Sequence, residues 1–181
     1  MWHKLIDADA LSRLPRRGRR LVFTNGCFDV LHRGHVEYLA AARAMGDLLV
    51  VAVNDDDSVR RLKGPGRPVN PAQDRALVLA ALQSVDHVVV FGEETPVALV
   101  ERVRPDVYVK GGDYRPEELP EARIVLGYGG RVRILPYLEG RSTTALLERA
   151  STSHAVGRRR DHDRDSWWQN VAMANLRQHD Y

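Results

Sequence analysis

Two histidines, His32 and His35, stand three residues apart at the start of an amphipathic run that ends at Gly46. The apolar residues 21–23 precede them, so the segment predicts a strand, a turn and a helix that begins near Gly34. Side chains three residues apart on a helix lie on one face. The first helical turn also offers unpaired backbone N–H groups and the positive end of the helix dipole. This spacing predicts a phosphate-binding pocket that contains two imidazoles.

Other interpretations of this segment stay open from the residues alone. The histidines could bind zinc, although no further His, Cys or carboxylate stands near them at the spacing of a zinc site. They could also be core histidines that bond to backbone groups. Cys27, the only cysteine, excludes an internal disulfide and could be a nucleophile, but the sequence fixes no base beside it. We interpret Cys27 as a small residue of the turn.

The rest of the chain alternates apolar runs with amphipathic segments. Five runs are predicted strands, separated by helices: residues 21–23, 48–53, 87–91, 106–109 and 131–135. This order predicts an α/β fold with a doubly wound, five-stranded parallel sheet of the Rossmann-like type. The domain is expected to span residues 21–150, after a leader at 1–20 and before a tail at 151–181 that is partly disordered or forms a docking helix.

Several helices have identifiable start signals. A short helix is expected at 7–11, one helix over 116–126, and a last one from Ser142 or Thr143. Asn70 is the predicted N-cap of another helix, with Pro71 at its first position. The predicted core stripe of that helix consists of Leu77, Val78, Ala81 and Leu82.

The most polar and glycine-rich segments follow predicted strands: residues 24–29, 54–57, 110–114 and 139–144. In an open parallel sheet, ligands bind beyond the carboxyl ends of the strands, near the switch in strand order. We therefore expect these segments to meet in one site. Lys110 could hold a phosphate and Asp113 a hydroxyl or magnesium, although two glycines also suit a plain turn.

The segment His32-x-Gly34-His35, preceded by Thr24-Asn25-Gly26-Cys27-Phe28-Asp29, resembles the HxGH signature of the cytidylyltransferase-like nucleotidyltransferase superfamily. Two further segments, Val109 to Tyr114 and Arg61 to Pro71, resemble the bacterial D-glycero-β-D-manno-heptose 1-phosphate adenylyltransferases, the ADP-heptose synthases. The segment 140–144 looks like the second superfamily signature at a helix start. Related glycerol-phosphate cytidylyltransferases carry an arginine where this chain has Tyr137, which weakens an assignment to CTP.

The resemblance implies the nucleotidyltransferase fold and the transfer of AMP from ATP to a sugar 1-phosphate, giving ADP-heptose and pyrophosphate, with Mg²⁺ on the triphosphate. It implies catalytic roles for His32, His35 and Lys110. Lys63 and Arg67 lie in a Gly/Pro-rich loop suited to closing over a substrate, so we expect them to bind the sugar phosphate. The expected nucleotide contacts are Thr24, Asn25, Gly26, Cys27, Phe28, Asn54, Arg75, Gly111, Asp113, Ser142, Thr143 and Thr144. Asp55 to Asp57 could recruit magnesium, but acidic residues are favoured at a solvated helix start without any metal, so no protein metal ligands are expected.

Two alternatives remain: a cytidylyltransferase for another phosphorylated alcohol, and a non-catalytic nucleotide-binding module. A net charge of +3 suits anionic metabolites without requiring nucleic acid. No apolar stretch approaches a membrane span, and the first residues lack the apolar core of a signal peptide, so we expect a cytoplasmic protein. The resemblance implies a homodimer, and at 181 residues a separate sugar kinase would supply the phosphate.

Overall fold

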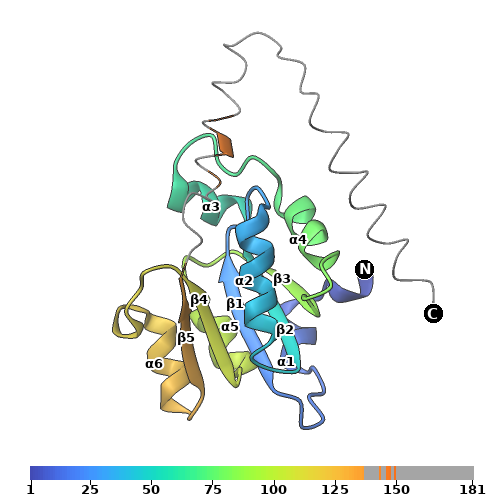
Figure 1. Ribbon diagram of the computed structural model, residues 1–181, viewed down its shortest axis with the longest axis vertical. Coiled ribbons are helices and arrows are strands. Elements are labelled where there is room, and N and C mark those ends of the chain that lie inside the picture. The colour runs from blue at the N-terminus through green and yellow to red at the C-terminus, as the bar shows by residue number, and fades with distance from the viewer. Residues whose placement is uncertain (137–142, 144–145, 148, 150–181) are drawn as a thin grey trace, which may run out of the picture. The chain divides into compact units, whose positions relative to one another are not determined.

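A parallel five-stranded sheet forms the centre of the computed structural model, which describes residues 1–136, 143, 146, 147 and 149 (Figure 1). Its strands are β1 Leu21–Gly26, β2 Leu48–Asn54, β3 His87–Phe91, β4 Val107–Gly111 and β5 Arg131–Leu135. They lie in the order β3-β2-β1-β4-β5, and every neighbouring pair is parallel. The order reverses between β1 and β4, which confirms the predicted doubly wound sheet.

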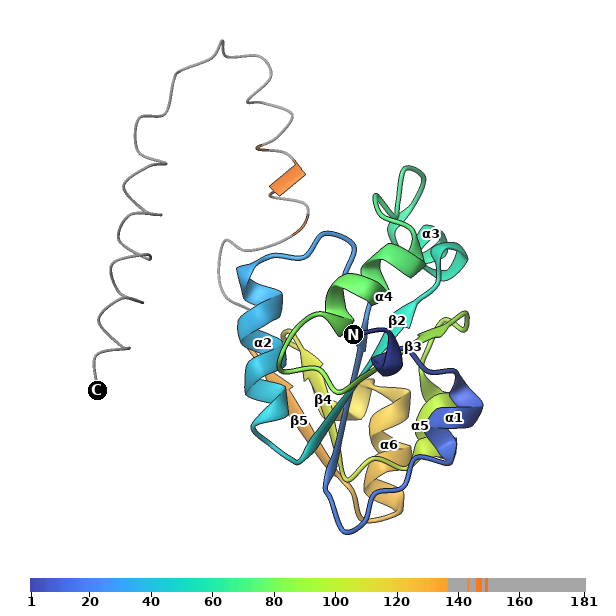
Figure 2. The same cartoon turned by 90° about the vertical axis from the view of Figure 1, so that its right-hand side faces the viewer.

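Helices cover both faces of the sheet (Figures 1 and 2). They are α1 Ala8–Ser12, α2 Arg33–Arg43, α3 Asp56–Lys63, α4 Ala72–Ala80, α5 Val97–Val103 and α6 Pro120–Gly127, with 3₁₀ turns at η1 Trp2–Lys4 and η2 Pro116–Glu118. Residues of α1, α5 and α6 share one hydrophobic cluster with the strands, and residues of α2 and α4 share the other. Successive strand residues point to opposite faces, so a continuous apolar run such as β2, buried at all seven positions, serves both clusters.

The predicted leader packs onto the sheet beside β3. The backbone N–H of Ile6 donates to the carbonyl of Val88 (3.0 Å), and Leu11 is buried. Lys4 Nζ donates to the carbonyls of Leu82 and Val85, at 3.1 and 2.7 Å. These first residues therefore contribute to the same core as the strands.

The start of α4 differs from the prediction. Pro71, not Asn70, is the N-cap residue, and the Asn70 side chain donates instead to the carbonyl of Asp29 (2.8 Å). The buried face consists of Ala72, Arg75, Ala76, Leu79 and Ala80, while Val78 of the predicted stripe is 47% exposed. The stripe was predicted from the helical spacing of apolar residues. The helix instead turns its alanines to the sheet, so that Arg75 can point inward.

Other boundaries shift at the ends of elements. The first strand continues through Gly26, so Thr24 and Asn25 belong to β1 rather than to the turn. The single helix expected over 116–126 is divided into η2 and α6, because Pro120 forces Leu119 before it into an extended conformation. Thr143 has helical backbone, while Ser142 and the tail 151–181 lie outside the described residues. No helix of the described residues is long and apolar enough to cross a membrane.

Candidate active site

The ends of β1 and β4, and the segments that follow β1 and β5, meet at the carboxyl edge of the sheet, where the strand order reverses. Lys110 at the end of β4 donates to Oδ1 of Asn25 at the end of β1 (3.2 Å). The Oγ1 of Thr143, from the segment after β5, donates to the carbonyl of Val30 in the turn after β1 (3.3 Å). These contacts bring together segments that the sequence analysis expects to meet, and their role in binding a ligand stays a prediction.

The two histidines stack at the amino end of α2. The ring centroids of His32 and His35 are 3.8 Å apart, with an angle of 24° between the rings, and the Phe28 ring packs edge-on against His35 at 5.2 Å. Burial and the neighbouring imidazole lower the pKa of His35 to about 4, so this ring is neutral at pH 7. A neutral imidazole can still donate one hydrogen bond to an anion.

His35 differs from a core histidine in its hydrogen bonding. Its Nδ1 is buried and makes no hydrogen bond to any described residue. A core histidine bonded to backbone groups would not leave this atom unsatisfied. Nor do three His, Cys, Asp or Glu side chains gather anywhere among the described residues in a way that could hold a metal ion.

Phe28 has an unusual backbone, with φ at +46°. It is 8% exposed, and a Cβ at Gly26 would lie 3.1 Å from its ring. Glycine at position 26 therefore leaves the space in which Phe28 folds back to support His35. This contact explains, in local terms, why a glycine and an aromatic residue stand two positions apart in the turn.

Lys110 lies in a buried polar group. Its ammonium is 3.6 Å from Oε1 of Glu121, which also accepts a hydrogen bond from the Tyr108 hydroxyl (2.6 Å). Burial lowers the pKa of Lys110, and the charge of Glu121 opposes that shift. The face of the Tyr114 ring lies 5.7 Å from the ammonium.

Arg75, which the sequence analysis expects to contact the nucleotide, is buried in α4. It is 2% exposed and donates to the carbonyl of Cys27 (2.6 Å), the carbonyl of Asn70 (2.9 Å) and Oδ1 of Asp56 (2.8 Å). The guanidinium thus joins the turn after β1 to α3 and α4. Whether Arg75 also contacts a nucleotide stays a prediction.

The segment between α3 and α4 is fastened to the same turn by Asp29. Its Oδ1 accepts from the backbone N–H groups of Val69 (2.6 Å) and Asn70 (3.1 Å). Its Oδ2 lies 2.7 Å from Nη1 of Arg67 in an ion pair that is not aligned for a hydrogen bond. Arg67, predicted to bind the sugar phosphate, therefore already has a carboxylate partner.

Cys27 and Lys63 lie close enough to interact electrostatically. Burial raises the pKa of the Cys27 thiol, and the charges of Lys63, Arg75 and Lys110 only partly oppose this. A thiol with a raised pKa is a poor nucleophile at neutral pH. Lys63 is the last residue of α3 and is exposed.

Thr24 and Tyr38 join the helix of the histidines to the sheet. Tyr38 OH donates to the carbonyl of Val109 (3.2 Å) and lies 2.7 Å from Oγ1 of Thr24. Because the phenol proton is used on Val109, the Thr24 hydroxyl is the donor to Tyr38. Thr24 is fully buried, so only its backbone could contact a nucleotide, which is how the prediction was made.

The remaining predicted residues differ in position. Asn54 is 3% exposed at the end of β2, Gly111 is the buried last residue of β4, and Asp113 is exposed. Ser142 and Thr144 lie outside the described residues. A cavity of about 410 Å³ opens beside the turn after β1, and it is lined by Phe28, Asp29, Leu31, Asn70, Asp74, Arg75, Leu77, Val78 and Leu79.

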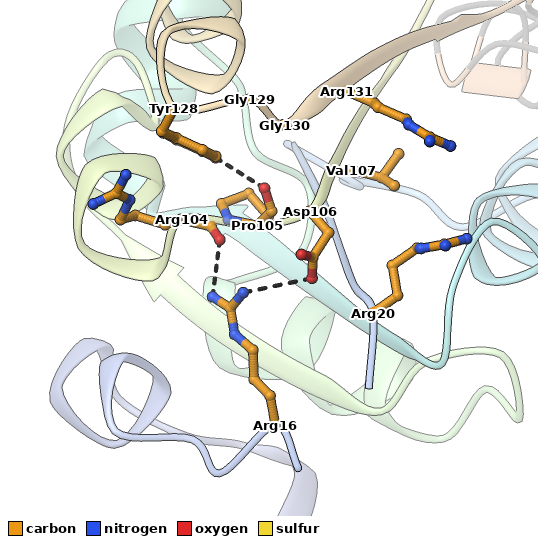
Figure 3. A pocket seen from close by; sticks show the side chains of 10 residues that line it. All are labelled: Arg16, Arg20, Arg104, Pro105, Asp106, Val107, Tyr128, Gly129, Gly130 and Arg131. Carbon is orange, nitrogen blue, oxygen red and sulfur yellow. Dashed lines mark hydrogen bonds and ion pairs between the residues drawn. The ribbon is translucent and has the colours of Figure 1, made fainter. Parts of the chain in front are cut away.

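A second cavity, of about 420 Å³, lies at the opposite edge of the sheet, where β4 and β5 begin (Figure 3). Four arginines line it: Arg16, Arg20, Arg104 and Arg131. It contains none of the predicted site residues. Arg16 points at Asp106 and at the carbonyl of Arg104, as the dashed lines in Figure 3 show.

The model of the family described as "Cytidylyltransferase-like" matches residues 23–148, which contain the histidine pair and Lys110. The chain belongs to this family. Membership confirms the predicted superfamily, and the parallel sheet described above is the fold that the resemblance implied.

Curated relatives share more than half of the aligned residues with this cytidylyltransferase-like chain. It is 55% identical to "Bifunctional protein HldE" of Syntrophotalea carbinolica over 82% of its own length, and 58% identical to the protein of that name from Chromohalobacter salexigens over 80%. Both matches cover 30% of the relative, so the chain spans about a third of the length of these proteins. A solved structure, the lipopolysaccharide core biosynthesis protein from Thermoplasma volcanium GSS1, is similar with a TM-score of 0.55 and 29% identity, covering 67% of this chain and 98% of that one.

Four residues of the candidate site received no assigned role in the sequence reasoning: Tyr108 and Glu121, which it did not name, and Asp29 and Asp56, which it named only as members of the segments expected to meet. Tyr108 had a usable signal, because it lies two residues before Lys110 on the same face of one strand. Glu121 had none, since an acidic residue in the first turn of a helix is favoured without any ligand. Asp29 and Asp56 act through contacts with residues that are distant in the sequence.

Proposed function

We propose that this chain transfers AMP from ATP to a sugar 1-phosphate, with D-glycero-β-D-manno-heptose 1-phosphate as the substrate, giving ADP-heptose and pyrophosphate. The observation that carries the proposal is the stacked pair His32 and His35 at the amino end of α2, a helix whose Tyr38 donates to Val109, the residue before Lys110. Support for the substrate comes from the resemblance of the segments around Lys63 and Lys110 to heptose 1-phosphate adenylyltransferases, and from the relatives named HldE.

The reaction needs no deprotonation of the nucleophile. An oxygen of the sugar phosphate is already anionic; it bonds to the α-phosphorus of ATP while the bond from that phosphorus to the bridging oxygen breaks. Pyrophosphate leaves with the electron pair. The protein's contribution is to place the two substrates in line and to stabilise the charge that moves to the leaving oxygen.

The groups at the carboxyl edge suit that task. A neutral imidazole donates a hydrogen bond without bringing a second full charge, while Lys110 adds a positive charge that burial makes effective. The backbone N–H groups at the start of α2 favour an anion at the same place. Mg²⁺ would enter with the triphosphate of ATP, as part of the substrate.

The test is a pyrophosphate-release assay that crosses ATP and CTP with heptose 1-phosphates and simple alcohol phosphates. We expect turnover with ATP and a heptose 1-phosphate, and its loss when EDTA removes Mg²⁺. ATP binding without pyrophosphate release from any pair would contradict the proposal and favour a non-catalytic nucleotide-binding module.

A cytidylyltransferase is the second candidate, favoured by the description of the matching family. Turnover with CTP and an alcohol phosphate, but not with ATP, would decide for it. Tyr137, which stands where glycerol-phosphate cytidylyltransferases have an arginine, weighs against this outcome.

A further inference from the structure

A buried carboxylate, Glu121, lies against the candidate catalytic lysine. Glu121 is 2% exposed in the first turn of α6, and its Oε1 lies 2.6 Å from the Tyr108 hydroxyl and 3.6 Å from Nζ of Lys110. A carboxylate at this depth is costly unless it is both hydrogen-bonded and paired with a positive charge. Tyr108 and Lys110 provide these two interactions.

Asn25 completes the group from the side of β1. Its Oδ1 accepts from Lys110 Nζ (3.2 Å) and from Tyr108 OH (2.7 Å). A phenol has one proton and can serve Asn25 or Glu121, but not both at once, whereas an ammonium has three. Lys110 is therefore the group that can satisfy Asn25 and Glu121 at the same time.

We propose that Glu121 is a positioning residue for Lys110, which it holds as an ammonium against Asn25 at the carboxyl edge of the sheet. The catalytic part of this inference rests on the proposed function, because it takes Lys110 to meet the nucleotide phosphates. The contact itself does not. The contact between Glu121 and Lys110 links α6, which packs on one face of the sheet, to the position of the ammonium in the candidate site.

The groups around Lys110 explain why a carboxylate matters there. Burial removes water from the ammonium and favours its neutral form, and the negative charge of Glu121 favours the charged form. The other groups that face Lys110 are the thiol of Cys27, the Tyr114 ring, the Tyr108 hydroxyl and Asn25. Among the described residues, the carboxylate at ion-pair distance from Lys110 is that of Glu121.

The first experiment compares the pH dependence of adenylyl transfer in Glu121→Gln and Tyr108→Phe. Glu121→Gln removes the charge and keeps the shape, so the alkaline limb of kcat/KM should move down by about one pH unit or more. We expect kcat to fall about 10- to 100-fold, with the KM for ATP changed less than about threefold. Tyr108→Phe removes the phenol proton but not the carboxylate, and should leave the alkaline limb in place.

Equal alkaline limbs in wild type and Glu121→Gln would overturn the inference. So would the same downward shift in Tyr108→Phe, because it would show a general effect of disturbing the core. Glu121→Asp restores the charge on a shorter side chain and should move the limb back toward that of the wild type.

A second readout does not depend on turnover. Competitive acylation with acetic anhydride, followed by peptide mass spectrometry, gives the pKa of Lys110 in the free protein. We expect a lower value in Glu121→Gln than in wild type, and equal values would refute the role of Glu121 even if the protein transferred no AMP. Conversely, a wild type that releases no pyrophosphate contradicts the proposed function while this measurement still stands.

Should Glu121→Gln fail to fold, the double variant Glu121→Gln/Lys110→Met decides the point. If the single variant unfolds because Lys110 is left buried without its carboxylate, removing the ammonium should restore folding. A double variant that is also unfolded would show that Glu121 stabilises the fold independently of Lys110, and would overturn the inference.

Discussion

The two edges of the sheet differ in how exposed their cationic side chains are. At the amino edge four arginines surround a cavity, and three of them, Arg20, Arg104 and Arg131, are exposed. Arg16, the fourth, donates to the carbonyls of Val103 and Arg104 and pairs with Asp106. At the carboxyl edge, Arg75 is buried and Lys110 is half-buried, and their carboxylate partners are Asp56 and Glu121.

We infer from this comparison that the burial and pairing of the cations, rather than their number, distinguish the candidate phosphate site. Charges in water are screened, and an exposed guanidinium must be ordered before it can act. A buried group at low dielectric that is already held in place acts more strongly and loses less entropy on binding. We therefore expect variants at the carboxyl edge to affect turnover, and variants at the amino edge to leave it unchanged.

His35→Ala should have the largest effect. Losing the ring removes a hydrogen-bond donor to the triphosphate and the support that Phe28 provides, and turnover should fall by about 10² to 10⁴. Pyrophosphate release under saturating substrates measures it, with the exposed His3→Ala as the matched control. Full activity in His35→Ala would remove the distinction between the two edges.

Asp29→Asn should have the next largest effect, because a nearly buried carboxylate binds two backbone N–H groups and faces Arg67. Replacing it leaves the guanidinium without its partner, and the free energy of unfolding should drop by about 2–3 kcal/mol. Urea denaturation measures the change. Asp57→Asn, in an exposed pair with Arg60, is the control and should cost less than about 0.5 kcal/mol. Equal effects of the two substitutions would contradict the role given to Asp29.

The neutral state of His35 predicts a pH-dependent stability. The pKa of His35 is lowered from 6.5 to about 4 in the folded protein. Between pH 6.5 and pH 4, this histidine is therefore protonated in the unfolded chain but still neutral in the folded one. This histidine's contribution is therefore complete above about pH 6.5 and is lost as the pH falls toward 4. Allowing for the part of the ring that solvent reaches, the loss should be about 2 kcal/mol.

Denaturation of wild type and His35→Gln at pH 7 and pH 4.5 tests this expectation. The stability of wild type should fall more over this range than that of His35→Gln, since the variant has no imidazole at position 35. The same pH dependence in both proteins would mean that His35 titrates normally.

The double variant Arg20→Gln/Arg131→Gln should have the smallest effect. Neither guanidinium is part of the carboxyl-edge site, so kcat/KM should change less than about twofold and stability by less than about 0.5 kcal/mol. Pyrophosphate release and urea denaturation measure these quantities. A loss of activity comparable to that of His35→Ala would show that the amino-edge cavity takes part in the reaction.

Much of this arrangement follows from local patterns in the sequence. Apolar runs predicted five parallel strands, and the rule that ligands bind at their carboxyl ends predicted that His32, His35 and Lys110 share one edge of the sheet. The contacts that fix these residues did not follow, because they join positions far apart in the chain. Arg75 reaches Cys27 only because α4 turns its alanines to the sheet, and the pairing of Asp29 with Arg67 depends on the path of the segment between two helices. Neither leaves a periodic signal.

The hydrogen-bonded series from Thr24 through Tyr38 to the carbonyl of Val109 has a consequence for the energetics of binding. Tyr38 is one turn after His35 on the same face of α2, so fixing the phenol also fixes how far that helix can rotate or slide over β1 and β4. The imidazole pair is thus oriented when the chain folds, before any substrate arrives. The entropy lost in ordering it belongs to folding and is not incurred again at each catalytic cycle.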